Sequence, residues 1–359
     1  MGGERRGRGG GARRGGGGGG AGAAVVTGCS SGIGAALCGE LARRGVRVFA
    51  LGRDPGALRG LEAEGGAGGV VALRADVTDA QSLETAFAEA ARQAPGGRID
   101  LCVANAGVSG CGALAVQVRP PLPAPPPSFA PPAPPDRPPF APPAGPRPPR
   151  RTAPPPPGRA ASSDSGPLQE HRTVQSIFDT NVTGACATVQ VAARHMLEQE
   201  RQGPGGLRGV IAVTGSVTSE VCMPWAAAYC ASKAAIKSLC RTSALELEPF
   251  GVRVTHLYTG AVKSKIADNA LARDPLASYD APDNPYHPYA AAIRGRARVS
   301  QGRAAWTAER YASEVATALL SPRPPREVVA GGGARALRLF ARTLPERLQD
   351  WVACRRFGL

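Results

Sequence analysis

The sequence lacks long apolar runs and paired cysteines. No stretch of eighteen apolar residues occurs among the 359 residues, so we expect no helix that crosses a membrane. The nine cysteines are scattered and none forms a C-x-x-C pair, which argues against a metal site or a redox dithiol. Their number is odd and no secretory signal precedes them. This combination predicts free thiols in a reducing compartment and a cytoplasmic protein without a bound metal.

Lysine is scarce, yet the chain is strongly basic because arginine is abundant. Lysine and arginine together number 43 against 28 acidic residues, which gives a net charge of +15. Residues 1–20 and 117–165 carry +4 each, and residues 323–359 carry +5. The rest of the chain carries only +2, so the charge pattern argues against a nucleic-acid-binding domain.

Two segments are too biased in composition to bury a core. Residues 1–22 are mostly Gly and Arg, which predicts a disordered tail: an RNA-binding segment, a targeting segment or a nonfunctional extension. Of the 35 prolines, 21 lie between Pro120 and Pro157. Because proline lacks an amide hydrogen and fixes φ, we predict that residues 119–165 are a disordered insertion. The insertion is either a polyproline ligand for a partner domain or a retained intron.

Strand-like and helix-like stretches alternate on both sides of the insertion. "AAVVTG", "VRVFALGR", "VVALRADV" and "IDLCVANAG" are typical of buried strands, and helical patterns separate them. The alternation resumes with one long helix over "TVQSIFDTNVTGACATVQVAARHML" and a strand at "GVIAVTGS". Such alternation implies parallel strands joined by right-handed crossovers. We therefore predict an α/β fold with a doubly wound parallel sheet, in one domain over 23–118 and 166–322.

The stretch "TGCSSGIG" joins the first strand to the first helix. Gly28 allows a tight turn, Gly32 lets a phosphate approach the backbone, and Gly34 permits close packing of the helix on the sheet. The free amides and the dipole of the helix N-terminus favour a pyrophosphate. We therefore predict a dinucleotide-binding turn made of Gly28, Ser30, Ser31, Gly32, Ile33 and Gly34.

Further motifs follow this turn in a regular order. They are Asp76-Val77 after the third strand, Asn105-Ala106-Gly107 after the fourth, Asn181 in the long helix, Ser216 after the fifth strand, and Tyr229 and Lys233 in "YCASK". With the G-x-x-x-G-x-G spacing, they make residues 23–320, apart from the insertion, resemble the short-chain dehydrogenase/reductase family. The resemblance implies a Rossmann-like fold and a nicotinamide cofactor that contacts these motifs, Tyr229, Lys233 and Val262.

The resemblance also implies a reaction mechanism. Tyr229 and Lys233 are one helical turn apart, so they project from one face of the helix. We expect the ammonium of Lys233 to lower the pKa of Tyr229, which then donates a proton to a carbonyl oxygen as hydride arrives. Ser216 would hydrogen-bond the same oxygen. In the family, the asparagine matched by Asn181 holds a water linked to the lysine.

The end of the second strand predicts which cofactor binds. NAD enzymes of this type usually carry a carboxylate there, which holds the ribose hydroxyls and repels a 2′-phosphate. Gly52 occupies that place and Arg53 follows, with Asp54 expected to turn away. Because a guanidinium pairs well with a phosphate, we predict NADPH and reduction; the alternative is an Arg53 that only faces solvent.

Two stretches narrow the expected substrate. "LELEPFGVRVTHLYTGAVKS", with Thr259-Gly260, and the ending from Gly331 are similar to the fungal-type NADPH-dependent 1-acyldihydroxyacetone-phosphate reductases of this family. A phosphorylated ketone could be received by one of the basic residues of the lid segment: Lys263, Lys265, Arg294, Arg296 and Arg298. Steroids and retinoids are the rival substrates, because "TGCSSGIG" and "VTGS…YCASK" also resemble hydroxysteroid and retinol dehydrogenases. A noncatalytic scaffold that acts through the proline-rich insertion is a hypothesis of another class.

Residues 323–359 are predicted to be a basic amphipathic extension. Apolar residues recur along it at helical spacing: Leu337, Phe340, Leu344, Leu348, Trp351 and Val352. Such a segment can lie on an anionic membrane surface, on the domain core or on a second subunit. We expect peripheral contact with the endoplasmic reticulum or lipid droplets if the tail binds lipid, and the family resemblance implies a homo-oligomer.

Overall fold

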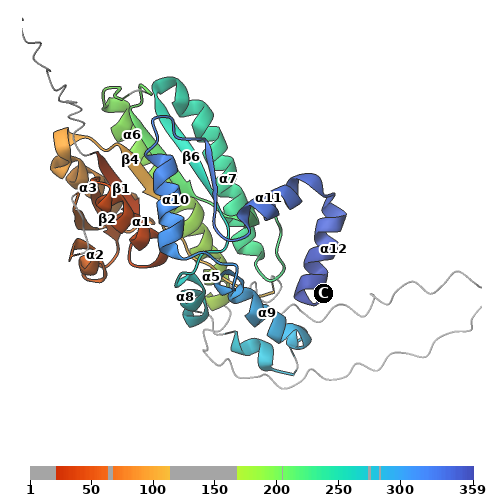
Figure 1. The fold of residues 1–359 in the computed structure, drawn as a ribbon. Coiled ribbons are helices and arrows are strands. Elements are labelled where there is room, and N and C mark those ends of the chain that lie inside the picture. Colours follow the sequence, from red (N-terminus) through yellow and green to blue (C-terminus); the bar gives the residue numbers. More distant parts are fainter. Residues whose placement is uncertain (1–21, 64–67, 114–167, 204, 274–275, 283) are drawn as a thin grey trace, which may run out of the picture.

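A single parallel sheet organises the described part of the chain, which in the computed structural model is residues 22–63, 68–113, 168–203, 205–273, 276–282 and 284–359. Its strands are β1 (Ala23–Thr27), β2 (Arg47–Gly52), β3 (Val70–Arg74), β4 (Leu101–Ala104), β5 (Gly209–Thr214), β6 (Val252–Thr259) and β7 (Glu327–Ala330). They lie in the order β3-β2-β1-β4-β5-β6-β7, and each neighbouring pair is parallel (Figure 1). The predicted doubly wound α/β fold is confirmed.

Helices cover both faces of the sheet because successive strand residues point to opposite sides and both sides are apolar. Val25 and Leu51 belong to one buried cluster, whereas Val26 and Ala50 belong to the other. The first face is covered by α3 (Ala80–Gln93), α6 (Ala185–Glu198) and α7 (Ala227–Leu247). The second face is covered by α1 (Gly32–Arg43), α2 (Arg59–Ala63) and α10 (Ala308–Leu319).

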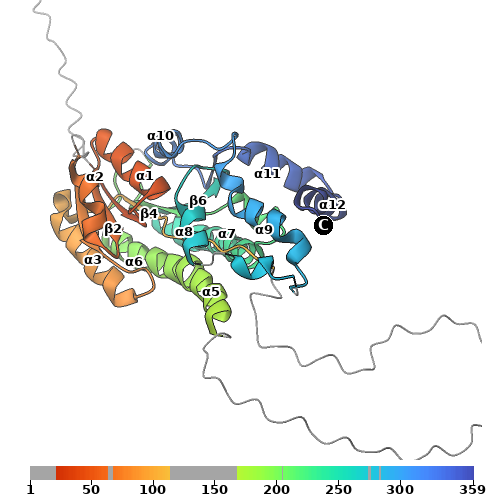
Figure 2. The ribbon, with the colours of Figure 1, turned by 90° about the horizontal axis from the view of Figure 1, so that it is seen from below.

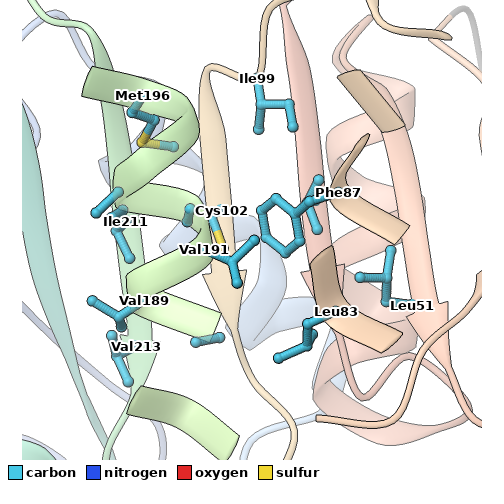
Figure 3. Packing of buried hydrophobic residues seen from close by; sticks show 14 of the residues in the cluster. Leu51, Leu83, Phe87, Ile99, Cys102, Val189, Val191, Met196, Ile211 and Val213 are labelled. Atoms are coloured by element: carbon cyan, nitrogen blue, oxygen red, sulfur yellow. The ribbon is translucent and has the colours of Figure 1, made fainter. Parts of the chain in front are cut away.

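The first cluster fixes two helices over the middle of the sheet. Phe87 of α3 and Met196 of α6 are fully buried; Phe87 lies near Cys102 of β4, and Met196 lies near Ile211 of β5 (Figure 3). Burying an apolar side chain of this size contributes about 1.5–3 kcal/mol. This packing holds the carboxyl ends of β1, β4 and β5 in place, and those ends carry the predicted site.

The strand order reverses between β1 and β4, because β2 and β3 lie on one side of β1 and the later strands on the other. Ligands of open α/β sheets bind at such a point, beyond the carboxyl ends of the strands. The remaining helices are α5 (Leu168–Phe178), α8 (Ile266–Arg273), α9 (Ala290–Ala297), α11 (Ala334–Thr343) and α12 (Glu346–Phe357). In Figure 2, α8 and α9 lie across this end of the molecule, and α11 and α12 lie beside it.

Two features differ from the sequence-based expectation. The predicted long helix is interrupted by a π-helical segment at Asp179–Gly184, which separates α5 from α6. The sheet also extends past residue 322, because β7 pairs with β6 within the segment that was expected to be a tail. The four residues "EVVA" are too few to identify a strand without its neighbour.

Some predictions fall on residues that the structure does not describe. The Gly/Arg-rich tail, up to residue 21, and the proline-rich insertion over 119–165 lie outside the described residues. Within the described residues, no helix combines the length and apolarity that a membrane crossing would need. All nine cysteines lie within the described residues, and no disulfide joins any two of them.

Candidate active site

The glycine turn follows β1 and is packed tightly against the end of β4. Gly28 has a φ of +71°, and a Cβ there would lie 2.7 Å from the Cα of Ala106. A Cβ on Gly34 would lie 2.3 Å from the carbonyl oxygen of Gly28. The predicted reasons for these two glycines, a tight turn and close packing, are therefore confirmed. At Gly32 the neighbour is Ser264, whose Cβ would be only 2.9 Å from an added Cβ.

Asn105 ties together the ends of three strands. Its side-chain amide donates to the carbonyl oxygens of Thr27 (3.1 Å) and Gly28 (3.3 Å), and its Oδ1 accepts from the hydroxyl of Thr214 (3.2 Å). The buried hydroxyl of Thr27 accepts from the backbone amides of Asn105 and Ala106. Sequence reasoning missed Thr27, although a polar residue at the end of an apolar strand was a signal for it.

One cavity of about 690 Å³ runs from the glycine turn to the first two turns of α7. It is lined by most of the predicted site residues: Gly28, Ser30, Ser31, Gly32, Ile33, Gly34, Arg53, Asp76, Val77, Asn105, Ala106, Gly107, Ser216, Tyr229, Lys233 and Val262. Among those predicted, Asn181 lies outside its lining. Lining residues that sequence reasoning missed include Thr78, Thr180, Met223 and Asn269.

Ser216, Tyr229 and Lys233 come together at one end of this cavity. Tyr229 and Lys233 stand on α7, with the Lys233 Nζ 5.8 Å from the centre of the phenol ring. Ser216 follows β5, and its hydroxyl accepts a hydrogen bond from the backbone amide of Thr218 (3.1 Å). The Ser216 hydroxyl is also close enough to the Tyr229 phenol to act on its pKa, which it lowers. The two hydroxyl groups can therefore face one carbonyl oxygen together.

Burial sets the proton affinity of both groups on α7. It raises the pKa of Tyr229, and the Ser216 hydroxyl and the positive charge of Arg296 only partly oppose it. Burial also lowers the pKa of Lys233 to about 8. The predicted lowering of the Tyr229 pKa is wrong for this structure, because burial has the larger effect and raises it. The Lys233 ammonium donates to the carbonyl oxygen of Thr214 (2.9 Å). At neutral pH the phenol is a neutral acid, which is the form that can donate a proton.

Asn181 lies behind the cavity, in the π-helical segment. Its Oδ1 accepts from the backbone amide of Val108 (2.7 Å), and its Nδ2 donates to the carbonyl oxygen of Val108 (2.9 Å) and to Ser232 (3.1 Å). A Cβ on Gly107 would lie 3.3 Å from that Oδ1 and 3.7 Å from the Lys233 Nζ. Asn181 thus fixes the segment after β4 against α7, close to Lys233.

Arg53 lines the cavity at the end of β2 and its side chain is exposed. Nearby, burial tends to raise the pKa of Asp76, but hydrogen bonds from the amide and hydroxyl of Thr78 and the charge of Arg53 outweigh it and lower the pKa. Asp54 accepts from the amide of Gly56 (2.8 Å) and is not part of the lining, as expected. A guanidinium therefore follows Gly52, which occupies the place where a ribose-binding carboxylate would stand.

The structure separates the basic residues of the lid segment into two groups. Lys265 and Arg296 line the cavity, whereas the other three basic residues do not. Arg294 forms an ion pair with Asp280. Lys263 and Arg298 are exposed. The sequence could not distinguish these residues, because the folding of the segment over the cavity depends on contacts with distant elements.

The C-terminal helices pack on the domain next to the cavity. Leu337 of α11 lines the cavity and contacts the buried cluster of Val217, Tyr258 and Ala334. Arg338 forms an ion pair with Glu327 of β7. Near the end of α12, Phe357 packs against the cluster that contains Trp225 and Ile293. Packing on the core, one of the three expected arrangements of this segment, therefore applies to α11 and to the end of α12.

No metal site is visible in the described part of the chain, where no three His, Cys, Asp or Glu side chains gather closely enough to hold an ion. The cavity has the features of a dinucleotide site instead. The first helix has no side-chain cap, so its N-terminal amides are free to face a ligand in the cavity. A glycine turn, an uncapped helix and a Ser-Tyr-Lys group in one cavity define an oxidoreductase that uses a nicotinamide cofactor.

The comparisons with known proteins agree with this class. The family model described as short chain dehydrogenase matches residues 22–118 and 158–274, which is more than half of the chain. The chain therefore belongs to the short-chain dehydrogenase family. It is 25% identical over 335 residues to an NADPH-dependent 1-acyldihydroxyacetone phosphate reductase of Saccharomyces cerevisiae, which covers 93% of this chain and 91% of the yeast protein.

Two further likenesses bear on substrate and fold. The chain is 27% identical over 311 residues to human 17-beta-hydroxysteroid dehydrogenase type 1, covering 84% of this chain and 74% of that protein. A crystal structure of a short-chain dehydrogenase/reductase from Burkholderia phymatum in complex with NAD matches with a TM-score of 0.62 and 22% identity, over 92% of this chain and 95% of that one. This structural match shows the fold, and the two named relatives differ in substrate.

Proposed function

We propose that this protein reduces a ketone to a secondary alcohol with NADPH, and that Tyr229 is the proton donor. The observation that carries the proposal is that Ser216, Tyr229 and Lys233 line the same cavity as the glycine turn. Catalysis of this kind needs a proton donor within hydrogen-bond reach of the carbonyl oxygen, next to the hydride source.

The residues of the cavity fit a dinucleotide. The glycine turn and the N-terminal amides of α1 would hold the pyrophosphate, Asp76 and Val77 the adenine end, and Asn105-Ala106-Gly107 and Val262 the nicotinamide end. When bound, the reduced nicotinamide supplies the hydride. Two close approaches, at Gly28 and Gly34, explain why larger side chains are excluded around this turn.

The side chains then do the proton chemistry. Ser216 donates a hydrogen bond to the carbonyl oxygen and stabilises the charge that develops on it. Tyr229 delivers its proton to that oxygen as hydride reaches the carbonyl carbon. Lys233, whose pKa of about 8 lies near neutrality, can pass a proton back to the phenolate. Asn181 acts by positioning, and a water held between it and Lys233 would extend the relay.

Arg53 supports NADPH over NAD. The end of β2 carries no carboxylate toward the cavity, and the Arg53 guanidinium is free to pair with a 2′-phosphate. The name of the yeast relative includes NADPH, while the bacterial structure holds NAD, so the family uses both cofactors.

For the substrate we propose a 1-acyldihydroxyacetone phosphate, with a steroid or retinoid as the second candidate. The likeness to the yeast reductase spans nearly all of the chain, and Arg296 in the cavity suits a phosphorylated ketone. The likeness to the human hydroxysteroid dehydrogenase favours the alternative. A protein that acts only as a scaffold through its proline-rich insertion would bind NADPH and yet turn over no carbonyl compound.

We also propose where the enzyme works. The exposed apolar residues of α12, Leu348, Trp351 and Val352, stand among arginines and suit peripheral contact with an anionic membrane, such as that of the endoplasmic reticulum or a lipid droplet. Apart from this membrane contact, we propose that the enzyme is cytoplasmic, forms a homo-oligomer and does not bind nucleic acid.

The test of the reaction is Tyr229→Phe in the full chain. We expect kcat to fall by about 100- to 10,000-fold because the proton donor is lost, while NADPH binding, followed by its fluorescence, persists. The matched control is Tyr286→Phe, since Tyr286 packs on the Trp225 cluster away from the cavity. Full turnover by Tyr229→Phe would rule out the mechanism.

A further inference from the structure

Arg296 is a buried guanidinium that has no partner among the described residues. It lies on α9, it is only 8% exposed, and it lines the cavity. Its Nε has no hydrogen-bond partner, and it forms no ion pair with an acidic residue of the described ranges. An arginine cannot lose its charge in a protein, and burying a charge without a partner is costly.

Three other arginines that are not fully exposed each have an acidic partner, unlike Arg296. Arg294, two residues earlier on α9, is more exposed and forms an ion pair with Asp280. Arg338, which is also partly buried, forms an ion pair with Glu327. Arg253 has an unpaired Nε but forms an ion pair with Glu248 at 2.9 Å. The positive charge of Arg296 is therefore available to something that enters the cavity.

Arg296 lies at the end of the cavity that holds Ser216, Tyr229 and Lys233, which we call the reacting end. Ile293, one turn before Arg296 on α9, packs in one buried cluster with Trp225, which comes just before α7, and Arg296 and Tyr229 line the same cavity. The charge of Arg296 also acts to lower the pKa of the Tyr229 phenol. Lys265, the other cation of the lid that lines the cavity, lies at the opposite end, where its backbone amide would be 3.9 Å from a Cβ on Gly32. Lys265 thus stands next to the expected cofactor phosphates, and Arg296 next to the expected carbonyl.

We propose that Arg296 binds an oxyanion, a phosphate or a carboxylate, that the ketone substrate carries close to its reacting carbonyl. The proposal rests on the proposed ketone reduction and adds the chemical class of the substrate. The planar fork of a guanidinium matches the geometry of such a group and gains strength in a buried site. A neutral steroid or retinoid offers no partner for this charge, so the residue disfavours those substrates.

The kinetic test compares paired ketones in the full-length enzyme with NADPH. The pairs are 1-palmitoyldihydroxyacetone phosphate with its dephosphorylated form, and a keto acid with its methyl ester. In at least one of the two pairs, we expect the kcat/KM of wild type to be about 100-fold higher for the charged ketone than for its neutral counterpart. Arg296→Met should lose most of that preference, chiefly through KM, and Arg296→Lys should recover part of it. The matched control is Arg298→Met, because Arg298 is exposed and does not line the cavity.

A second readout does not depend on turnover. If the charge of Arg296 is unpaired, Arg296→Met should raise the Tm of the ligand-free protein, and inorganic phosphate should raise the Tm of wild type by more than that of the variant, which keeps the proposed cofactor-phosphate site. The proposal would be overturned if wild type and Arg296→Met showed the same ratio of kcat/KM for charged over neutral ketones. A lowered Tm in the variant would also overturn it. If wild type reduces no ketone, the proposed function fails, and the response of the Tm to phosphate still decides whether Arg296 binds an oxyanion.

Discussion

Burial, more than charge pairing, controls the two titratable residues at the reacting end of the cavity. Lys233 is 5% exposed, and its ammonium donates to a neutral carbonyl oxygen, that of Thr214. No acidic side chain of the described ranges forms an ion pair with Lys233, so removal from water favours the neutral amine. The same effect keeps Tyr229 protonated. Both shifts are consequences of position in the fold and have no signature in the "YCASK" motif.

The buried Lys233 makes stability depend on pH. Burial lowers the pKa of Lys233 in the folded state to about 8, from 10.5 for a lysine in water. Between these values the unfolded state binds more protons, so the free energy of unfolding rises with pH. Relative to Lys233→Met, wild type should gain on the order of 3 kcal/mol across this window. Chemical denaturation of both proteins from about pH 7 to about pH 10 measures the difference, and a constant difference would contradict the prediction.

Arg53 is expected to decide the cofactor. Arg53→Asp should replace attraction of the 2′-phosphate by repulsion and shift the ratio of kcat/KM values for NADPH and NADH by about 100-fold or more toward NADH. Arg59→Asp is the control, because it makes the same charge change on a nearby exposed residue that does not line the cavity. An unchanged NADPH preference in Arg53→Asp would show that Arg53 only faces solvent.

At the scale of elements, the join of β1 and α1 combines a strained turn with a helix that must approach the sheet closely. Two glycines of α1, Gly34 and Gly39, differ in whether a close contact requires a glycine. Gly34 has the Gly28 carbonyl oxygen at 2.3 Å from an added Cβ, whereas Gly39 has nothing within 4 Å. A glycine pattern in the sequence cannot distinguish a glycine required by a close contact from one that is merely tolerated.

The two glycines therefore respond oppositely to alanine. Gly34→Ala should cost about 1–3 kcal/mol or more, because the new methyl group clashes with rigid backbone, and should weaken NADPH binding. Gly39→Ala should gain about 0.5–1 kcal/mol from its higher helix propensity and leave NADPH binding unchanged. Denaturation midpoints and fluorescence titration check both. A Gly34→Ala protein with normal stability would mean that the turn shifts easily.

The long helix before β5 shows another limit at this scale. Its apolar periodicity predicts a helix correctly over both α5 and α6, yet the π-helical segment between them is not encoded in a recognisable pattern. The segment places Asn181 where its amide contacts both Val108 and Ser232. π-Helical segments often occur at functional sites, and here the contacts of one side chain with two other elements accompany it.

At the scale of the whole molecule, the C-terminal helices connect the cavity to the surface. The apolar side chains divide between two environments: Leu337 faces the cavity, while Leu348 is 42% and Trp351 57% exposed. An arginine, Arg355, lies over the Trp351 ring at 5.5 Å. A tail with this division could contact a membrane with α12 and keep α11 against the active site.

The expected membrane contact can be tested with vesicles. The double variant Leu348→Ser/Trp351→Ser should lose at least about tenfold in binding to phosphatidylserine vesicles, because two side chains no longer enter the interface. Leu245→Ser/Phe250→Ser is the matched control, since those exposed apolar residues lie at the end of α7. Vesicle sedimentation measures both, and equal binding by the two variants would exclude α12 as the contact.

The sequence by itself determined the order of strands and helices, the glycine turn and the Ser-Tyr-Lys group, because each depends on spacing within a short stretch of chain. It did not determine that β7 completes the sheet, that Leu337 reaches the cavity, or that Arg296 and not Arg298 turns inward. The tertiary structure alone decided these features. Each depends on which distant surfaces pack together and on how much water that packing excludes from a charge.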